Sequence, residues 1–362
     1  MKSPKHDREV NRRRHTLPAM LLVLVLLTAL LITPRLAHAS TFTVNSTADT
    51  TDADLGDGIC DDGTGLCTLR AAIEEANALE GADTIYFDPT VFPPGAPATI
   101  SPASDLPPLA DPTAGTTIDG TGAGVIVDGN NNPDLILGFS LFSDNNVLRR
   151  LQIQRFPGDG VLIGGSDNTV EHCYIGTDAA GNDLGNGGNG VNIQPLDEGA
   201  GSNTVGPGNV IGFNDLDGVM VMGSNNVVQG NYIGTDAAGN DLGNGGNGVT
   251  IMSILETEGS NTVGPGNVIG FNDLDGVVVW GSNNTVQGNY IGTDAAGNDL
   301  GNDANGVDIQ SIEGIGGSNT VGPGNVIGFN EFDGVIIWGS NNTVQGNYIG
   351  TDATGRDLGN AL

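Results

Sequence analysis

Short apolar runs separated by glycine- and asparagine-rich corners repeat along most of the chain. A segment of the form G-V-x-[IV] returns at steps that alternate between 30 and 28 residues. It begins at Gly160, Gly190, Gly218, Gly248, Gly276, Gly306 and Gly334. The isoleucine of "YIG" returns every 58 residues, from Ile175 to Ile349. The pattern therefore predicts a regular array over residues 160–362, in which turns of about 29 residues form 58-residue pairs.

Each turn reads as three short strands joined by tight corners. In one turn these are "GVVVW" (276–280), "NTV" (284–286) and "NYI" (289–291), and tight corners favour Gly and Asn. A repeat of this size buries its apolar face only against neighbouring turns. Because the turns hold strands and no helical periodicity, the expected fold is an all-β parallel β-helix solenoid, with three short strands per turn and turns stacked about 4.8 Å apart.

Asparagine recurs at two corner positions of the array. One column holds Cys173, Asn209, Asn231, Asn267, Asn289, Asn325 and Asn347. The other holds Asn168, Asn203, Asn226, Asn261, Asn284, Asn319 and Asn342. Stacked asparagines can bond to one another and to the backbone at a corner. Their expected role is therefore structural.

The region before the array has a different pattern. The segment "CTLRAAIEEANALEG" (67–81) predicts a helix. Its apolar face consists of Leu69, Ile73 and Ala76. A solenoid needs a cover over its open end, so residues 40–83 are expected to form an N-terminal helical cap. Residues 84–159 then read as irregular early turns of the β-helix.

The first 39 residues form a separate segment. Six basic residues within positions 2–14 precede the apolar run "LPAMLLVLVLLTALLIT", and "AHA" ends the segment at residue 39. That order is typical of a secretory signal cleaved before Ser40. The alternative is an uncleaved anchor, since 17 mostly apolar residues are near the lower limit for a membrane span. In both cases the remainder is exported, to the extracellular space or the cell surface, and cleavage would leave no membrane contact.

Charge is distributed unevenly between the signal segment and the remainder. Residues 40–362 carry five arginines, no lysine and 41 acids, which gives a formal charge of −36. A surface of this kind repels nucleic acid and favours cations. We therefore expect no nucleic-acid partner, and the acidity is equally typical of a soluble secreted protein.

The chain has three cysteines. Cys60 and Cys67 lie close together in a loop-like stretch of an exported chain, so a disulfide between them is expected. Cys173 occupies a repeat position that holds asparagine elsewhere. It is therefore expected to be buried and inert rather than reactive.

Residues 42–78 resemble a known exported module. "CTLRAA" (67–72) matches in part the motif for which the CSLREA domain is named, although Thr68 and Ala71 depart from it. Such modules lead bacterial exported right-handed β-helix proteins of the pectin-lyase-like superfamily. The resemblance implies export and a right-handed solenoid. It implies no reaction, because proteins of this fold include lyases, hydrolases, epimerases and adhesins.

One cluster is a candidate for catalysis. Polysaccharide lyases of this fold abstract a proton next to a carboxylate with a basic side chain, and commonly use Ca²⁺. The residues that could serve are Arg149, Arg150, Arg155 and His172, which lie near the start of the array. The alternative is that these arginines pair with the acid-rich surface.

The repeated loop "TDAAGNDLGN" is a candidate for calcium binding. Its copies supply Asp178 and Asp183, Asp236 and Asp241, and Asp294 and Asp299. Hard oxygen ligands on a glycine-rich loop suit Ca²⁺. The loop lacks the ordered ligand spacing of a known calcium motif, and the alternative is that Asp and Asn bond their own backbone to hold the turn. No cofactor is otherwise indicated.

The sharper binding signal lies on the first strand of each turn. Side chains alternate along a strand, so the last residue of "GVVVW" points outward. The outward column holds Gln194, Met222, Met252, Trp280, Gln310 and Trp338, with Asp308 in the column beside it. An exposed apolar stripe edged with amides is typical of a binding surface. The alternative is that the loops after these strands, such as 253–259, fold back over it.

The sequence thus favours a non-catalytic secreted or cell-surface protein that binds polysaccharide or another surface through this stripe. A polysaccharide lyase or other carbohydrate-active enzyme is the first alternative, and a purely structural spacer is the second. The array shows no polar terminal cap near residue 362. End-to-end self-association, or an array that is longer than this sequence, is therefore expected.

Overall fold

The computed structural model describes the chain in five stretches, which are residues 39–130, 132–196, 201–252, 259–310 and 317–361. The predicted signal segment lies outside them except for residue 39. Within these stretches no helix is long and apolar enough to cross a membrane. The described chain belongs to one compact unit, Ala37–Leu362.

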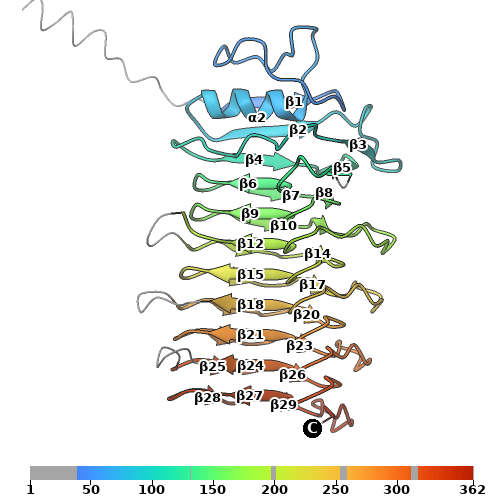
Figure 1. Cartoon of the computed structure of the whole chain (residues 1–362), viewed down its shortest axis with the longest axis vertical. Coiled ribbons are helices and arrows are strands. Elements are labelled where there is room, and N and C mark those ends of the chain that lie inside the picture. Colours follow the sequence, from blue (N-terminus) through green and yellow to red (C-terminus); the bar gives the residue numbers. More distant parts are fainter. Residues whose placement is uncertain (1–38, 131, 197–200, 253–258, 311–316, 362) are drawn as a thin grey trace, which may run out of the picture. The chain divides into compact units, whose positions relative to one another are not determined.

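In the described stretches, 29 strands form three sheets in which all neighbouring strands are parallel. Figure 1 shows how the strands stack from turn to turn. Sheet A contains β1 (Thr41–Val44), β2 (Asp83–Phe87), β4 (Thr116–Asp119), β7 (Val147–Arg149), β10 (Thr169–Glu171), β13 (Thr204–Val205), β16 (Val227–Val228), β19 (Thr262–Val263), β22 (Thr285–Val286), β25 (Thr320–Val321) and β28 (Thr343–Val344). Sheet B contains β3 (Ala98–Ile100), β5 (Val125–Asp128), β8 (Gln152–Gln154), β11 (Tyr174–Ile175), β14 (Val210–Ile211), β17 (Tyr232–Ile233), β20 (Val268–Ile269), β23 (Tyr290–Ile291), β26 (Val326–Ile327) and β29 (Tyr348–Ile349). Sheet C contains β6 (Phe139–Leu141), β9 (Val161–Ile163), β12 (Val191–Ile193), β15 (Val219–Met222), β18 (Val249–Met252), β21 (Val277–Trp280), β24 (Val307–Gln310) and β27 (Val335–Ile337).

Each turn of the array adds one strand to sheet C, then one to sheet A and one to sheet B. In one turn these strands are β21, β22 and β23, and β24 begins the next turn beside β21. The inward side chains Val277, Val279 and Ile291 are fully buried, because each turn covers the apolar face of the turn before it. The predicted right-handed parallel β-helix with three strands per turn is confirmed.

Both predicted asparagine columns exist as ladders of hydrogen bonds. At the corner between sheets A and B, the Asn231 N–H donates to Asn267 Oδ1 at 3.0 Å, and Asn267 Nδ2 donates to Asn289 Oδ1 at 2.9 Å. At the corner between sheets C and A, Asn261 and Asn284 repeat the same contact. Each side chain bridges two turns, so the predicted structural role is confirmed.

A single helix in the described residues, α2 (Leu69–Ala78), lies at the β1 end of the stack (Figure 1). Thr68 caps it, with its hydroxyl accepting from the Ala71 N–H at 3.1 Å. Leu69 and Ile73 are fully buried on its inner face, which contacts β1 and β2. The expected cap position is therefore observed. The strand β1 was not foreseen, and it places one full strand of sheet A within residues 40–83.

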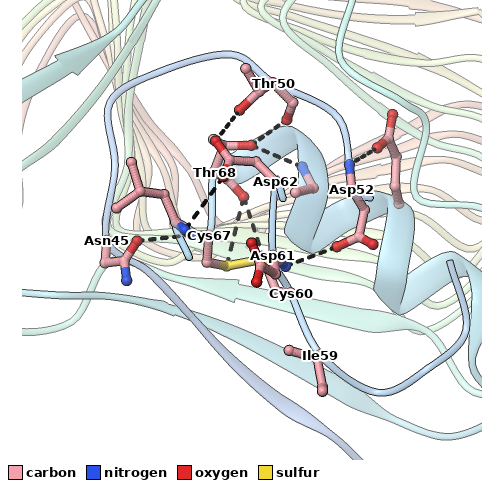
Figure 2. Close-up of a disulfide and its surroundings, with 12 residues drawn as sticks. Asn45, Thr50, Asp52, Ile59, Cys60, Asp61, Asp62, Cys67 and Thr68 are labelled. Carbon is pink, nitrogen blue, oxygen red and sulfur yellow. Dashed lines mark hydrogen bonds between the residues drawn. A yellow bond between two sulfur atoms is a disulfide. The ribbon is translucent and has the colours of Figure 1, made fainter. Parts of the chain in front are cut away.

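The cap is tied together by a disulfide between Cys60 and Cys67, as predicted (Figure 2). The loop before α2 is also braced by acids that accept backbone N–H groups. Glu75, fully buried on α2, accepts from the N–H groups of Gly56 and Gly58. Arg70 forms an ion pair with Asp49 at 2.9 Å. Because these groups are paired, the acidic loop can lie against the helix.

The last described turn differs from the others in its exposure. Ile337 is 37% exposed and Ile349 is 43% exposed, although Ile309 and Ile327 on the turn before are 1% and 0% exposed. Isoleucines at positions that are buried on the preceding turns are therefore exposed on the last described turn. The expectations of end-to-end association or of a longer array stay predictions.

Candidate functional site

The outward column of sheet C is continuous from strand to strand. The pairing registers place Met222 beside Met252, Met252 beside Trp280, and Trp280 beside Gln310. Trp338 continues the column, because its N–H donates to the Ile309 carbonyl at 2.7 Å and Ile337 pairs with Ile309. The two tryptophans of the protein therefore lie two turns apart in one column, about 10 Å from each other. We call this set of five residues the sheet C column.

Exposure is highest at the last residue of the sheet C column. Met222, Met252, Trp280 and Gln310 are partly exposed, and Trp338 is 62% exposed. The indole N–H of Trp280 is buried and has no hydrogen-bond partner in the described chain. Gln194 is exposed one turn before Met222. The column thus presents apolar faces and the Gln310 amide, and it contains one buried donor without a partner in the described chain.

The neighbouring column is less accessible than expected. Thr250, Val278 and Asp308 are 3%, 4% and 6% exposed, whereas Asp308 was expected to line the binding face. Met252, Trp280 and Gln310 lie on the same strand face two residues further along. These larger side chains reduce the accessible surface of the shorter ones. Asp308 Oδ2 accepts from Gln310 Nε2 at 2.5 Å. Burial, and less strongly the nearby Asp275 carboxylate, raise the pKa of Asp308.

The loops that could cover the sheet C column follow its strands directly. Residues 253–258 follow Met252, and residues 311–316 follow Gln310. Both lie outside the described residues. The alternative that these loops fold back over the column therefore stays a prediction.

Two of the three candidate catalytic arginines are paired with acids. Arg149, at the end of β7, forms an ion pair with Asp119 at 2.7 Å, and Arg155, beyond the end of β8, forms one with Asp128. The hydrogen bonds to these carboxylates raise the pKa of both guanidinium groups. Arg150 and His172 are exposed near the end of β7. For Arg149 and Arg155 the geometry matches the alternative that the arginines pair with acids. A guanidinium held in an ion pair is poorly suited to remove a proton.

The single unpaired cysteine of the described chain is enclosed. Cys173 is 1% exposed and lies at the start of the ladder between sheets A and B, where its N–H donates to Asn209 Oδ1 at 2.9 Å. Burial raises the pKa of its thiol to about 12. It is therefore buried and unreactive, as expected.

The aspartates of the repeated loop bind the loop itself. Asp236 Oδ1 accepts from the N–H groups of Ala238 and Asn240, and its Oδ2 accepts from Asn240 Nδ2 at 2.7 Å. Partial burial acts to raise the pKa of Asp236, but the bonds from Asn240 and Ala238 together lower it. Asp178 and Asp294 have the same contacts.

The second aspartates of the loop, Asp183, Asp241 and Asp299, are exposed. In the described chain no group of three His, Cys, Asp or Glu side chains is placed to hold a metal ion. The geometry favours the alternative of backbone bonding. Calcium binding stays a prediction.

The sequence analysis missed a further corner, between sheets B and C. Each turn contributes four consecutive residues to this corner. Its first position is a third asparagine ladder, formed by Asn186, Asn214, Asn244, Asn272, Asn302, Asn330 and Asn360. Its fourth position alternates between Asp and Asn, in the order Asp159, Asn189, Asp217, Asn247, Asp275, Asn305 and Asp333. The ten-residue loop enters this corner on every second turn, which hides the common spacing in the sequence.

Comparison with known proteins gives structural similarity without a family. The chain is similar to the A-module of the Azotobacter vinelandii mannuronan C-5 epimerase AlgE6, with 17% identity, 81% of this chain and 96% of that chain covered, and a TM-score of 0.42. It is similar to pectate lyase Pel9A, with 14% identity, 86% and 80% covered, and a TM-score of 0.45. It is also similar to PfbA, a surface adhesin of Streptococcus pneumoniae, with 13% identity, 81% and 76% covered, and a TM-score of 0.36.

No family model matches the chain, and no curated protein matches it. The CSLREA resemblance of the cap is therefore not confirmed and stays a prediction. At the identities and TM-scores above, the solved structures support no statement about activity. The fold rests on the three parallel sheets of the chain itself.

Proposed function

We propose that this is an exported or cell-surface β-helix protein that binds polysaccharide without transforming it. The observation that carries the proposal is the register of the sheet C column, which aligns Met222, Met252, Trp280, Gln310 and Trp338 across successive turns. Such an alignment makes a continuous surface from side chains far apart in the sequence. The signal-like first 39 residues support export.

The chemistry of the column suits sugar rings. An indole face stacks on the apolar C–H face of a sugar, and an indole N–H or an amide exchanges hydrogen bonds with hydroxyls. Trp280 and Trp338 lie about 10 Å apart, or two turns of the stack, so an extended chain of sugars can contact both. The flanking Gln194 and Gln310 amides can donate and accept.

The contacts of the candidate bases favour binding over turnover. Arg149 and Arg155 are held in ion pairs with Asp119 and Asp128, and the four arginine and histidine candidates are spread over two corners. The acids of the array recur in each 58-residue repeat. A hydrolytic site, by contrast, needs two carboxylates at a defined separation.

The test is a glycan array probed with residues 40–362, scored for retention and for release of unsaturated sugars. Retention without release is expected. Trp338→Ala should weaken binding of a retained glycan roughly tenfold or more, as removal of a central aromatic anchor does. Tyr348→Ala is the matched control, because Tyr348 is 41% exposed but lies on sheet B.

Two outcomes contradict the proposal in different ways. Release of unsaturated sugars would show a lyase, and the arginines would become the next residues to substitute. Equal loss of binding in the Tyr348→Ala and Trp338→Ala proteins would place the glycan elsewhere. Absence of any retained glycan would favour the spacer reading.

A further inference from the structure

The corner between sheets B and C stacks four residues per turn into a continuous ladder. The backbone bonds run from turn to turn, as when the Leu216 N–H donates to the Gly188 carbonyl at 3.1 Å and the Gly246 N–H donates to the Leu216 carbonyl at 2.9 Å. The first position is the buried Asn ladder. The fourth position is the Asp/Asn ladder, which is buried at Asn189 and Asp217 and partly exposed at its other members. The second and third positions face outward, and we call these two positions the B–C corner.

The B–C corner alternates between two kinds of turn. One kind presents an acid followed by a large apolar residue, namely Asp215-Leu216, Asp273-Leu274 and Glu331-Phe332. The other kind presents Gly187-Gly188, Gly245-Gly246 and Asp303-Ala304. Leu216, Leu274 and Phe332 are 53%, 49% and 48% exposed. Exposed apolar side chains thus recur every two turns, about 10 Å apart, which differs from the scattered exposure of an ordinary surface.

The small residues between them have a packing cause. A Cβ on Gly246 would lie 2.5 Å from Asp217 Oδ1 and 2.8 Å from the Leu216 carbonyl carbon. The close approach of the Asp/Asn ladder therefore leaves little room for a side chain at Gly246, and the largest residue at this position on the alternate turns is Ala304. Small residues thus alternate with Leu216, Leu274 and Phe332 along the corner.

A hollow of about 720 Å³ lies beside the second position of the B–C corner, and Leu216 and Leu274 are not among the residues that line it. Gly245 lies at its centre in the ladder, with Asp215 on the turn before and Asp273 on the turn after. Asp183, the partly exposed Phe213 and Arg155, which is paired with Asp128, also line it. No hydrogen bond or ion pair from the described chain reaches the side chains of Asp215 and Asp273. Two unpaired carboxylates thus stand on either side of an open space.

The position equivalent to Gly245 in the next 58-residue repeat shows that the B–C corner is strongly negative. There Asp303 replaces Gly245. Burial raises the pKa of Asp303, and so do the charges of Glu331, Asp273 and Asp241. Carboxylates on neighbouring turns of the corner therefore lie close enough to repel one another. A cation placed between them would relieve that repulsion.

The charges of the chain limit which kinds of ligand can bind the B–C corner. A second copy is disfavoured, because residues 40–362 hold 41 acids and five arginines, and three of those arginines are paired with acids of the chain. A bare metal ion would leave the leucines unused, and the described residues offer no three-ligand metal group. The pattern of acid and leucine calls for a partner that carries both cations and apolar side chains.

We propose that the B–C corner binds a basic, leucine-bearing extended segment of a partner protein. Lysine or arginine side chains of the segment reach Asp215 and Asp273 beside the Gly245 hollow, and its apolar side chains pack on Leu216 and Leu274. A segment in the extended polyproline II conformation advances about 3.1 Å per residue with three residues per turn, so cations at every third residue lie on one face and match carboxylates two turns apart. This surface is distinct from the sheet C column and does not depend on glycan binding.

The experiment measures fluorescence anisotropy of a labelled peptide, with Lys-Leu-Ser repeated four times, on residues 40–362 at physiological salt. Two peptides serve as probes of mechanism, one with Ser in place of each Leu and one with Glu in place of each Lys. The test variant is Asp215→Asn/Asp273→Asn. Its matched control is Asp167→Asn/Glu80→Gln, which removes the same charge from exposed positions outside the corner. Melting temperatures verify that all variants are folded.

The Lys-Leu-Ser peptide is expected to bind, and the corner variant to bind about five- to tenfold more weakly than the control variant, since two exposed ion pairs are lost. A second variant, Leu216→Gln/Leu274→Gln, should weaken the Lys-Leu-Ser peptide but not the Lys-Ser-Ser peptide. Equal affinity of the corner and control variants would overturn the proposal by showing general attraction to an acidic surface. Absence of binding by the Lys-Leu-Ser peptide would overturn it as well.

Discussion

Buried asparagines connect neighbouring turns through both their side chains and the backbone. Asn267 Oδ1 accepts from Asn231 N and Nδ2, while Asn267 Nδ2 donates to Asn289 Oδ1 and the Val228 carbonyl. The amide suits this position because it both donates and accepts. A residue that can do only one of these would leave a buried backbone group without a partner.

Asn267→Ala is expected to lower the free energy of unfolding by about 2–4 kcal/mol, because several bonds are lost and the buried Asn231 N–H is orphaned. Urea unfolding followed by circular dichroism measures the change. Gln287→Ala, at a partly exposed position, is the control and should change stability by less than about 0.5 kcal/mol. A similar small change for Asn267→Ala would show that the ladder contributes little.

Asp217 is a charged member of a buried ladder. Burial raises the pKa of its carboxyl, against opposing bonds from Thr250 and Asn247. A carboxyl whose pKa is raised by folding stabilises the fold in its neutral form, so this contribution is present below the ordinary aspartate pKa of 3.8 and is lost as the pH rises through the folded pKa.

Asp217→Asn, which copies the residue of the neighbouring turns, should therefore raise the melting temperature at pH 7. The gain should shrink as the pH falls and vanish near pH 3, where wild-type Asp217 is neutral. A gain that is equal at both pH values would mean that the charge of Asp217 is not its cause.

At the scale of elements, the strands and the asparagine ladders at two of the three corners were predictable, and the corner between sheets B and C was not. The apolar alternation in "GVVVW" identified β21 because one face is buried against the next turn and register follows from that face. The ladders between sheets B and C were missed because a loop enters on alternate turns and because Asp replaces Asn at every second step. The binding of Asp236 to its own loop depends on backbone geometry, which the repeat pattern does not reveal.

The disulfide of the cap closes a loop with a sequence separation of 7. Loop-closure entropy predicts that Cys60→Ser/Cys67→Ser lowers the free energy of unfolding by about 2.5 kcal/mol. Thermal unfolding of residues 40–362, with and without reductant, measures this. An unchanged melting temperature in both comparisons would show that the hydrogen bonds of Glu75 and the ion pair of Arg70 hold the cap without the disulfide.

Calcium binding by the repeated loops has a direct test. If these loops bind Ca²⁺, the melting temperature rises with added Ca²⁺ and falls with chelator, because a ligand of the folded state stabilises it. The variant Asp241→Asn/Asp299→Asn should then lose most of the rise. The observed binding of each first aspartate to its own loop leads us to expect a flat response, and a rise that these substitutions abolish would contradict that expectation.

At the scale of the whole molecule, the repeat pattern of the sequence predicted the fold but only part of the candidate site. A 58-residue repeat can be recognised from sequence because every copy must stack on the last. The alignment of Trp280 with Trp338 followed from the same counting. The burial of Asp308 and the ion pairs of Arg149 and Arg155 did not, because they depend on which side chains from other turns lie beside them.

The sheet C column contains both tryptophans of the protein, so intrinsic tryptophan fluorescence reports on this surface alone. The decisive measurement is a titration of residues 40–362 with a glycan retained on the array, with affinity measured in parallel by calorimetry. The account predicts a saturable change in tryptophan emission at the calorimetric Kd, reduced in Trp338→Ala. Calorimetric binding with unchanged emission would contradict it, because the glycan would then bind away from the sheet C column.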